Sequence, residues 1–411
     1  MLKKIRVEDL CLGMHIKEFC GSWMEHPFWR EDFLLTDHDD LRRVLQSSVR
    51  EVWIDVAKGI DAVPEVVAQS IERAEKDVGE TLQGVEQTAA EARPPHQQAT
   101  RSEELRRAAR ICAQSKQAVV SMFQEVRMGR AIDVEAAAAV AEEISSSVAR
   151  NPGALISLAR LKSADDYTYM HSVAVCALMT ALAHQLALDA TATREAAMAG
   201  LLHDLGKALT PVEILNKPGK LSDEEFAVMK QHPVDGHRLL LEKGAVGEIP
   251  LDVCLHHHEK MDGSGYPDGL AGDRITLFAR MGAVCDVYDA ITSNRPYKAG
   301  WDPAESIRRM AEWSRGHFDG RVFQAFVRSI GIYPVGSLVR LESGRLGVVV
   351  EQAPKSLLTP QVKVFFSTKS QTYIPPEIID LARPRVRDKI VGREDAAQWG
   401  IKDFDSYWAA P

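Results

Sequence analysis

The stretch REAAMAGLLHDLGK, at residues 194–207, joins an apolar helical pattern to a histidine-aspartate pair. His203 and Asp204 stand where the run of small and apolar residues ends, and a glycine and Lys207 follow them. Burying a carboxylate without a partner costs several kcal/mol, and a divalent cation satisfies a histidine and an aspartate together. Taken alone, a helix-terminal pair of this kind would more often lie in solvent. The interpretation therefore depends on whether similar residues occur on other helices.

Further residues of the same chemical types occur in helical segments elsewhere. They are His171 in DDYTYMHSVAV, His232 in MKQHP, His257 and His258 in CLHHHEKMDGSGYP, and Asp286 in ARMGAVCDVYDAITS. We expect His171 to begin a helix, and His232 to end the helix that starts at Ser222. Apolar neighbours should turn each of these side chains towards a common core.

The candidate ligands are imidazoles and carboxylates, without thiolates, and they outnumber what one ion requires. This chemistry favours iron, manganese, nickel or zinc. A carboxylate such as Asp204 can bridge two ions, and paired metals activate water and stabilise the leaving oxygen of a phosphoester. The residues therefore predict a two-metal site that hydrolyses phosphate esters.

Residues 165–298 resemble the HD-GYP family of the HD phosphohydrolase superfamily, which comprises bacterial phosphodiesterases that degrade cyclic di-GMP. The pieces that carry the resemblance are DDYTYMHS, HDLGK, ILNKPGKL, MKQHP, HHEKMDGSGYPDGL and DVYDAITSNRPYK. Residues 1–85 are similar to a domain of unknown function that often precedes HD-GYP domains. A single short motif would be weak support, but a set in this order is specific.

The resemblance assigns roles to individual positions. It implies metal ligands at His171, His203, Asp204, His232, His257, His258 and Asp286. One metal would take His171, His203, Asp204 and Asp286, and the other Asp204, His232, His257 and His258. Catalytic roles fall on Lys207 and Asp204, and substrate contacts on Asp165, Lys207, Tyr266, Asp289, Arg295 and Lys298. His256 is expected not to be a ligand, and Lys217 with Lys220 is either a mobile basic lid or a solvated loop.

The implied activity is metal-dependent hydrolysis of cyclic di-GMP to linear pGpG and, more slowly, to GMP, which lowers the level of this second messenger. The expected cofactors are two divalent ions, iron or manganese before nickel or zinc. Some relatives carry a glutamate four residues before the first histidine, associated with a third metal. Tyr167 occupies that position here, and a neutral phenol is a poor ligand at neutral pH, which favours two metals.

Two other functions stay open from the sequence. One is a cyclic di-GMP receptor or protein-interaction hub with negligible turnover, and the other is a hydrolase of another cyclic dinucleotide. The loop around Tyr266 is a candidate surface for partner proteins such as diguanylate cyclases. A homodimer is a further expectation.

The fold class expected from the patterning is mainly α, with small β-containing parts at both ends. Residues 1–85 form a small α+β domain with a regulatory or dimerising role, and residues 86–102 a linker. Residues 103–332 form the all-helical domain, in which Ser222 with Glu225 and Asp302 with Pro303 mark helix starts. Residues 333–382 alternate as a small β appendage, and residues 383–411 are expected as a loose tail.

Composition excludes several classes of protein. The 411 residues are 45% hydrophobic and 26% charged, as in ordinary soluble proteins, and no apolar run is long enough to span a bilayer. The net charge of −8 disfavours binding to long nucleic acid. Six cysteines without a CxxC pair suit a reducing compartment, and with the absence of a secretory signal they predict a cytoplasmic protein.

Overall fold

The computed structural model divides into two compact units, Met1–Gln83 with Arg308–Arg315, and Gly84–Ile307 with Gly316–Pro411. The residues that the structure describes are 2–20, 32–47, 49–62, 69–70, 73, 76–80, 82, 84–85, 101–161, 167–217, 219, 221–242, 246–294, 300–353, 356–402 and 404–409. Within these residues, no helix combines the length and the apolar character needed to cross a membrane.

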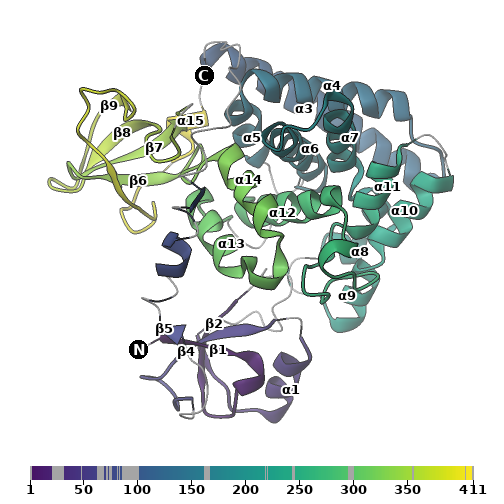
Figure 1. Cartoon of the computed structure of the whole chain (residues 1–411), viewed down its shortest axis with the longest axis horizontal. Helices are drawn as coiled ribbons and strands as arrows, with labels where there is room; N and C mark the ends of the chain where they lie inside the picture. The colour runs from purple at the N-terminus through teal and green to yellow at the C-terminus, as the bar shows by residue number, and fades with distance from the viewer. Residues whose placement is uncertain are drawn as a thin grey trace. The chain divides into compact units, whose positions relative to one another are not determined.

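The N-terminal region contains a small antiparallel sheet and one capped helix (Figure 1). Its elements are β1 (Leu2–Arg6), β2 (His15–Phe19), β3 (Phe33–Leu34), α1 (His38–Gln46), β4 (Glu51–Asp55) and β5 (Gln69–Ser70). The strand order is β3-β2-β4-β1-β5, and alternate residues such as Ile5, Ile16 and Ile54 form its buried core. The Asp37 carboxylate accepts a hydrogen bond from the Asp39 amide and so caps α1. The predicted α+β character of this region is confirmed.

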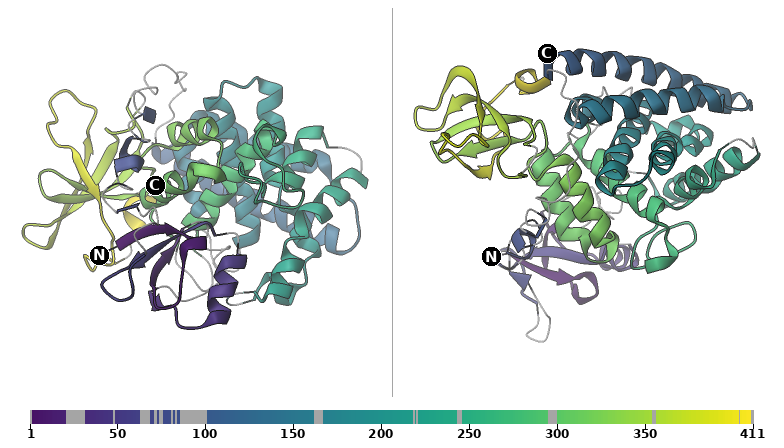
Figure 2. Two further views of the ribbon diagram at one scale, coloured as in Figure 1. Left: turned by 60° about the horizontal axis from the view of Figure 1, so that its bottom comes forward. Right: turned by 45° about the horizontal axis from the view of Figure 1, so that its top comes forward.

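The middle of the chain is helical, as predicted. Its helices are α3 (Arg101–Arg127), α4 (Val134–Arg150), α5 (Pro152–Arg160), α6 (Tyr167–Gln185), α7 (Ala190–Leu202), α8 (Val212–Leu215), α9 (Asp223–Met229), α10 (His232–Glu242), α11 (Glu248–His256), α12 (Leu277–Thr292), α13 (Pro303–His317) and α14 (Gly320–Ile330). Helix α6 is buried on all sides from Met170 to Ala183, and it packs against α3, α4, α5, α7, α12 and α14. A helix without a polar face belongs in the centre of a bundle, and Figure 2 shows α6 among its neighbours.

Two predicted helix starts are confirmed, and one predicted helix end is wrong. Ser222 and Glu225 form the capping box of α9, and the Asp302 carboxylate accepts hydrogen bonds from the first amides of α13. His232 does not end the helix that Ser222 begins, because α9 stops at Met229 and His232 opens α10. The physical reason is Pro233, which lacks an N–H and is tolerated in the first turn of a helix but not in its interior.

The C-terminal region is the predicted β appendage. Its antiparallel strands are β6 (Leu338–Leu341), β7 (Arg345–Glu351), β8 (Gln361–Ser367), β9 (Thr372–Asp380) and β10 (Ile390–Arg393), in the order β10-β6-β7-β8-β9. The turn expected at Ser343-Gly344 is present, and Gly344 adopts the left-handed φ of +82° that favours glycine.

The expectation of a loose tail from Arg383 is wrong. Strand β10 pairs with β6, and α15 (Ser406–Ala409) places Trp408 in the core of the C-terminal region with no exposed surface. The Trp408 ring packs with Leu338 and Leu346, and the Arg160 guanidinium lies 4.8 Å from its centroid. Most residues between 383 and 395 are charged. The few apolar residues among them show no periodicity from which a strand could be predicted.

Candidate metal centre

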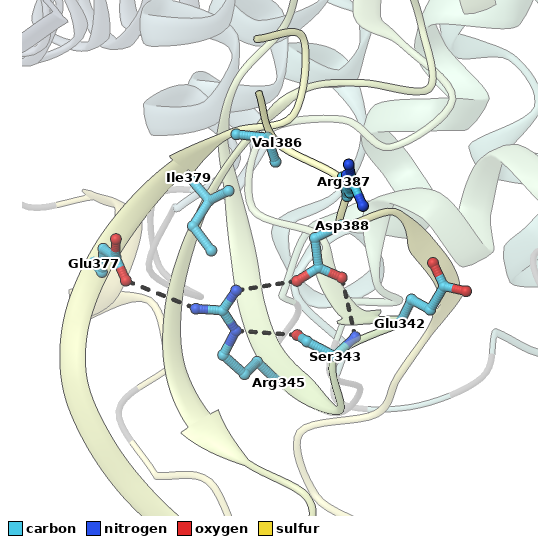
Figure 3. A pocket seen from close by; sticks show the side chains of 8 residues that line it. All are labelled: Glu342, Ser343, Arg345, Glu377, Ile379, Val386, Arg387 and Asp388. Atoms are coloured by element: carbon cyan, nitrogen blue, oxygen red, sulfur yellow. Dashed lines mark hydrogen bonds and ion pairs between the residues drawn. The ribbon is translucent and has the colours of Figure 1, made fainter. Parts of the chain in front are cut away.

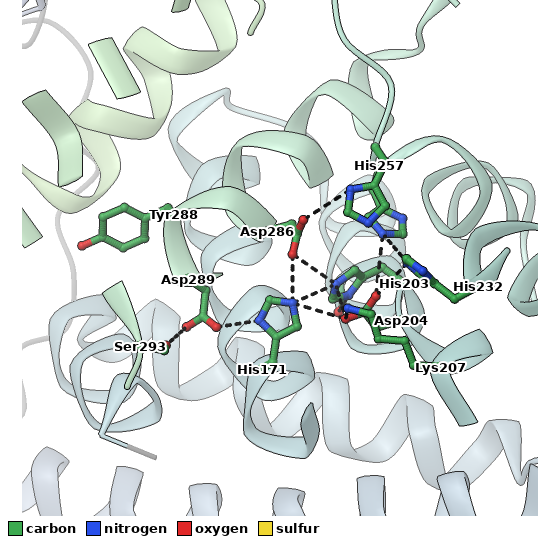
Figure 4. A network of polar contacts seen from close by, with 12 residues as sticks. His171, His203, Asp204, Lys207, His232, His257, Asp286, Tyr288, Asp289 and Ser293 are labelled. Atoms are coloured by element: carbon green, nitrogen blue, oxygen red, sulfur yellow. Dashed lines mark hydrogen bonds and ion pairs between the residues drawn. The ribbon is translucent and has the colours of Figure 1, made fainter. Parts of the chain in front are cut away.

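The seven residues predicted as metal ligands converge in one place, although they are spread over five helical segments (Figure 4). His171 lies one turn into α6, His203 caps the C-terminal end of α7, and Asp204 follows directly. His232 is the first residue of α10, His257 caps the C-terminal end of α11, and Asp286 lies within α12. Most of these ligands therefore lie near the ends of helices, and Asp286 lies in the interior of α12. All of them point towards one place.

The first group of ligand atoms lies on one side of Asp204. His171 Nε2 is 2.9 Å from Asp286 Oδ1 and 3.3 Å from Asp204 Oδ2. His203 Nε2 is 3.4 Å from the same oxygen of Asp204. Ligand atoms of His171, His203 and Asp286 lie within 4.8 Å of one another, close enough to share one ion.

The second group lies against the other carboxylate oxygen. His232 Nε2 is 3.3 Å and His257 Nε2 is 3.7 Å from Asp204 Oδ1. His232, His257 and His258 offer ligand atoms within 4.8 Å of one another. Because each oxygen of Asp204 faces a different group, the geometry suits a carboxylate that bridges two ions.

Hydrogen bonds on the far side of three of the rings fix which nitrogen of each of these histidines carries the proton. The Nδ1 atoms donate to backbone carbonyls: His203 to Gly200 at 2.9 Å, His232 to Met229 at 2.7 Å, and His257 to Val253 at 3.0 Å. A carbonyl can only accept, so each Nε2 presents a lone pair to the cluster. Metal-binding histidines are typically supported in this way.

The Nε2 atoms of the cluster face one another in pairs. His203 Nε2 lies 3.3 Å from His171 Nε2, and His232 Nε2 lies 3.4 Å from His257 Nε2. Among the described residues, Asp204 Oδ1 and Asp286 Oδ2 are buried oxygens without a hydrogen-bond partner. Buried acceptors that face each other without donors are costly, and divalent cations would satisfy all of them. The donor set therefore fits divalent metal ions.

The electrostatics of the cluster favour the same state. Burial opposes a charge on His171, but the carboxylates beside it outweigh burial and raise its pKa to about 10. Burial would also raise the pKa of Asp204, yet Lys207 and neighbouring histidines hold it well below its usual range. Burial lowers the pKa of His257 to about 3. Metal binding needs ionised carboxylates and neutral imidazoles, so a cation must displace the proton that the carboxylates stabilise on His171.

Lys207 is the cation nearest to the bridging carboxylate in the described part of the chain. Its ammonium lies 2.5 Å from Asp204 Oδ2, and its side chain is 19% exposed. An ammonium donates and cannot bind a metal, so Lys207 stands at the edge of the centre where an anion would approach.

The loop that carries Tyr266 is held close to the ligands. The Tyr266 ring stacks on His258 with centroids 4.7 Å apart. The loop is anchored by Glu259, whose carboxylate accepts the Asp268 amide at 2.8 Å and the Leu270 amide at 3.0 Å. Sequence reasoning missed Glu259. The signal was an acidic residue directly after two ligands and before a glycine-rich turn with amides to satisfy.

The other predicted site residues fall in different surroundings. Asp165, Arg295, Lys298 and Lys220 lie outside the described residues. Asp289 contacts His171, and its expected role in substrate binding stays a prediction. His256 bonds to Asp252 and Asp268, and Lys217 pairs with Glu225.

A separate pocket of about 540 Å³ opens on the C-terminal sheet (Figure 3). Arg345 lies at its centre and contacts Asp388 and the Ser343 hydroxyl, each at 3.0 Å. None of the predicted site residues lines this pocket.

The chain is similar to known protein families and to curated proteins. A family model described as "HD domain" matches residues 143–322, and one described as "Domain of unknown function (DUF3391)" matches residues 2–137. The chain is 56% identical to a cyclic di-GMP phosphodiesterase of Pseudomonas aeruginosa over 409 residues, which cover 99% of this chain and 96% of that protein. It is 43% identical to the cyclic di-GMP phosphodiesterase response regulator RpfG of Xanthomonas campestris, over 36% of this chain and 39% of that protein. It is 38% identical to the 3'3'-cGAMP-specific phosphodiesterase 1 of Vibrio cholerae, over 40% of this chain and 38% of that protein.

Proposed function

Because the chain belongs to the family of HD-domain cyclic di-GMP phosphodiesterases, we propose that it hydrolyses cyclic di-GMP to linear pGpG, and more slowly to GMP, around Asp204. The observation that carries the proposal is the complete donor set, in which the two oxygens of Asp204 face two groups of ligands. A binding module that had lost its activity would be expected to lack some of these donors.

We assign each group of donors to one divalent ion, with iron or manganese as the first candidates. The first ion would be held by His171, His203, Asp204 and Asp286, and the second by Asp204, His232, His257 and His258. When bound, such ions activate water and offset the charge of a phosphodiester. The protein's own contribution is to hold the rings through their Nδ1 hydrogen bonds, so that the Nε2 atoms stay unprotonated and aligned.

Lys207 is proposed to contact a phosphate oxygen of the substrate. Its ammonium already lies beside a carboxylate oxygen, and in the presence of substrate it would offset negative charge that develops on phosphate. Tyr266 is proposed as a further contact, because it stacks on His258 at the edge of the centre.

The proposal is tested by following the products over time. Protein prepared without oxygen and loaded with manganese or iron would be incubated with cyclic di-GMP, and the products separated by chromatography. We expect pGpG to accumulate before GMP appears, because the linear product must bind again with an additional terminal phosphate charge. GMP without transient pGpG would contradict this order, and no turnover with either metal would favour a receptor that binds without cleaving.

The same assay with 3'3'-cGAMP tests a second candidate substrate. The observation that favours it is the 38% identity to a 3'3'-cGAMP-specific phosphodiesterase over 164 residues. A higher kcat/KM for 3'3'-cGAMP than for cyclic di-GMP would replace the proposed substrate and leave the metal centre unchanged.

Replacing Lys207 should separate substrate binding from metal binding. We expect Lys207→Ala to keep its metal content and to lower kcat by about 100-fold, because one positive donor to the phosphate is lost. The measurements are elemental analysis and steady-state kinetics. Lys17→Ala is the matched control, since it removes a lysine that pairs with Asp32 at 2.6 Å in the N-terminal unit, and it should leave both quantities unchanged. Loss of metal from Lys207→Ala would show that the division of roles is wrong.

A further inference from the structure

His171 differs from the other supported histidines of the centre in what holds its Nδ1 atom. His203, His232 and His257 donate to carbonyls within three or four residues of themselves. His171 Nδ1 instead lies 2.6 Å from Oδ2 of Asp289, a residue of another helix, 118 positions away in the sequence. Asp289 is only 2% exposed, so this contact is shielded from water.

We infer that Asp289 is a positioning residue that fixes the proton of His171 on Nδ1 and directs its Nε2 towards the metal. The inference rests on the proposed metal centre and refines the expectation that Asp289 contacts substrate. An ionised carboxylate can only accept, so the short contact keeps a proton on Nδ1, and Nε2 is the nitrogen that would give up its proton and bind a metal ion. A carboxylate partner also makes the imidazole a stronger metal ligand.

Helix α12 holds the ring of His171 through both of its nitrogens. Asp286 Oδ1 lies 2.9 Å from Nε2, and Asp289 Oδ2 lies 2.6 Å from Nδ1 (Figure 4). The two aspartates are three residues apart and therefore share one face of the helix. The Ser293 hydroxyl donates to Asp289 Oδ1 at 3.3 Å and orients this carboxylate. One helix thus supplies a ligand and the support for a ligand on α6.

The first test measures metal affinity in the absence of substrate. We expect Asp289→Asn to weaken zinc binding by 10-fold to 100-fold in a competition titration with a chelator, the range typical of such supporting residues. Asp252→Asn is the matched control, because Asp252 Oδ1 lies 2.7 Å from Nδ1 of His256, which is not among the proposed ligands. Its zinc affinity should stay within about twofold of wild type, since only a carboxylate that supports a ligand acts on the metal.

The second test reads the tautomer directly. In zinc-loaded protein with 15N-labelled histidines, NMR should show His171 protonated on Nδ1, and in Asp289→Asn the His171 signals alone should change. Ser293→Ala, which keeps the carboxylate, serves if Asp289→Asn does not fold, and it should weaken zinc binding in the same direction by a smaller factor. Zinc affinity within twofold of wild type in both variants would overturn the inference. A raised KM for cyclic di-GMP with that unchanged affinity would return Asp289 to substrate binding. Because zinc binding is measured without nucleotide, failure of the proposed substrate would not affect the result.

Discussion

Asp204→Asn should lose metal and reduce hydrolysis by more than about 100-fold, beyond the effect typical of residues that only support a ligand. The substitution keeps the size of the side chain and removes the charge that both groups of histidines face. An amide would also bring N–H donors among the unprotonated Nε2 atoms where a cation is needed. Elemental analysis and the rate of cyclic di-GMP hydrolysis are the two measurements.

Asp235→Asn provides the matched control for this variant. Asp235 lies on α10, the helix of His232, and pairs with Arg238 at 2.9 Å on the surface. Exposed pairs contribute little, so its activity and metal content should equal those of the wild type. If Asp204→Asn kept its metal and had activity within tenfold of wild type, Asp204 could not be the bridging ligand.

Gly206→Ala should be among the most destabilising single substitutions in the helical domain. A Cβ atom at Gly206 would collide with the carbonyl oxygen of His232 and would lie 2.6 Å from the amide nitrogen of Gly236. Both atoms belong to the backbone of α10, so the clash can be relieved only by moving that helix. We expect a loss of about 3 kcal/mol in the free energy of unfolding, at the upper end for overpacking.

Movement of α10 would also displace His232, so metal content should fall together with stability in Gly206→Ala. Denaturant unfolding of the metal-free protein and elemental analysis measure the two effects. Gly320→Ala is the control, because a Cβ atom there meets nothing within 4 Å. If Gly206→Ala had the same free energy of unfolding as the wild type, the turn after Asp204 could not be packed closely against the backbone of α10.

The positions of the site residues could be predicted from sequence because their chemistry is carried by short local motifs. His203 with Asp204, and His257 with His258, are adjacent in sequence, and they indicate metal ligands once the similar residues in other helical segments are considered with them. Periodicity also predicted the helical middle of the chain and the alternating strands that follow. The predicted helix end at His232 was wrong because Pro233 prefers the first turn of a helix, which makes His232 the first residue of α10.

The supporting interactions could not be predicted, because each joins residues that are distant in sequence or unremarkable in type. Asp289 lies three residues after Asp286 and so shares its helix face, but nothing in this spacing shows that Asp289 meets His171 Nδ1. Glu259 accepts hydrogen bonds from the backbone amides of Asp268 and Leu270, and the sequence position of Glu259 before a glycine-rich turn is only a weak indication of this contact. The same holds for Trp408, which contacts Leu338 and Leu346 across a gap of more than fifty residues.

Strand β10 also determines which edge the C-terminal sheet shows to other molecules. Without residues 383–411 that edge would be β6, whose Leu338, Val339 and Leu341 are almost completely buried. An uncovered apolar strand invites pairing with a second copy and aggregation. Strand β10 replaces it with a short edge that has an irregular register between Ile390 and Gly392 and is flanked by charged residues. The C-terminal segment therefore covers the apolar edge of β6 and leaves β10 and β9 as the two edges of the sheet.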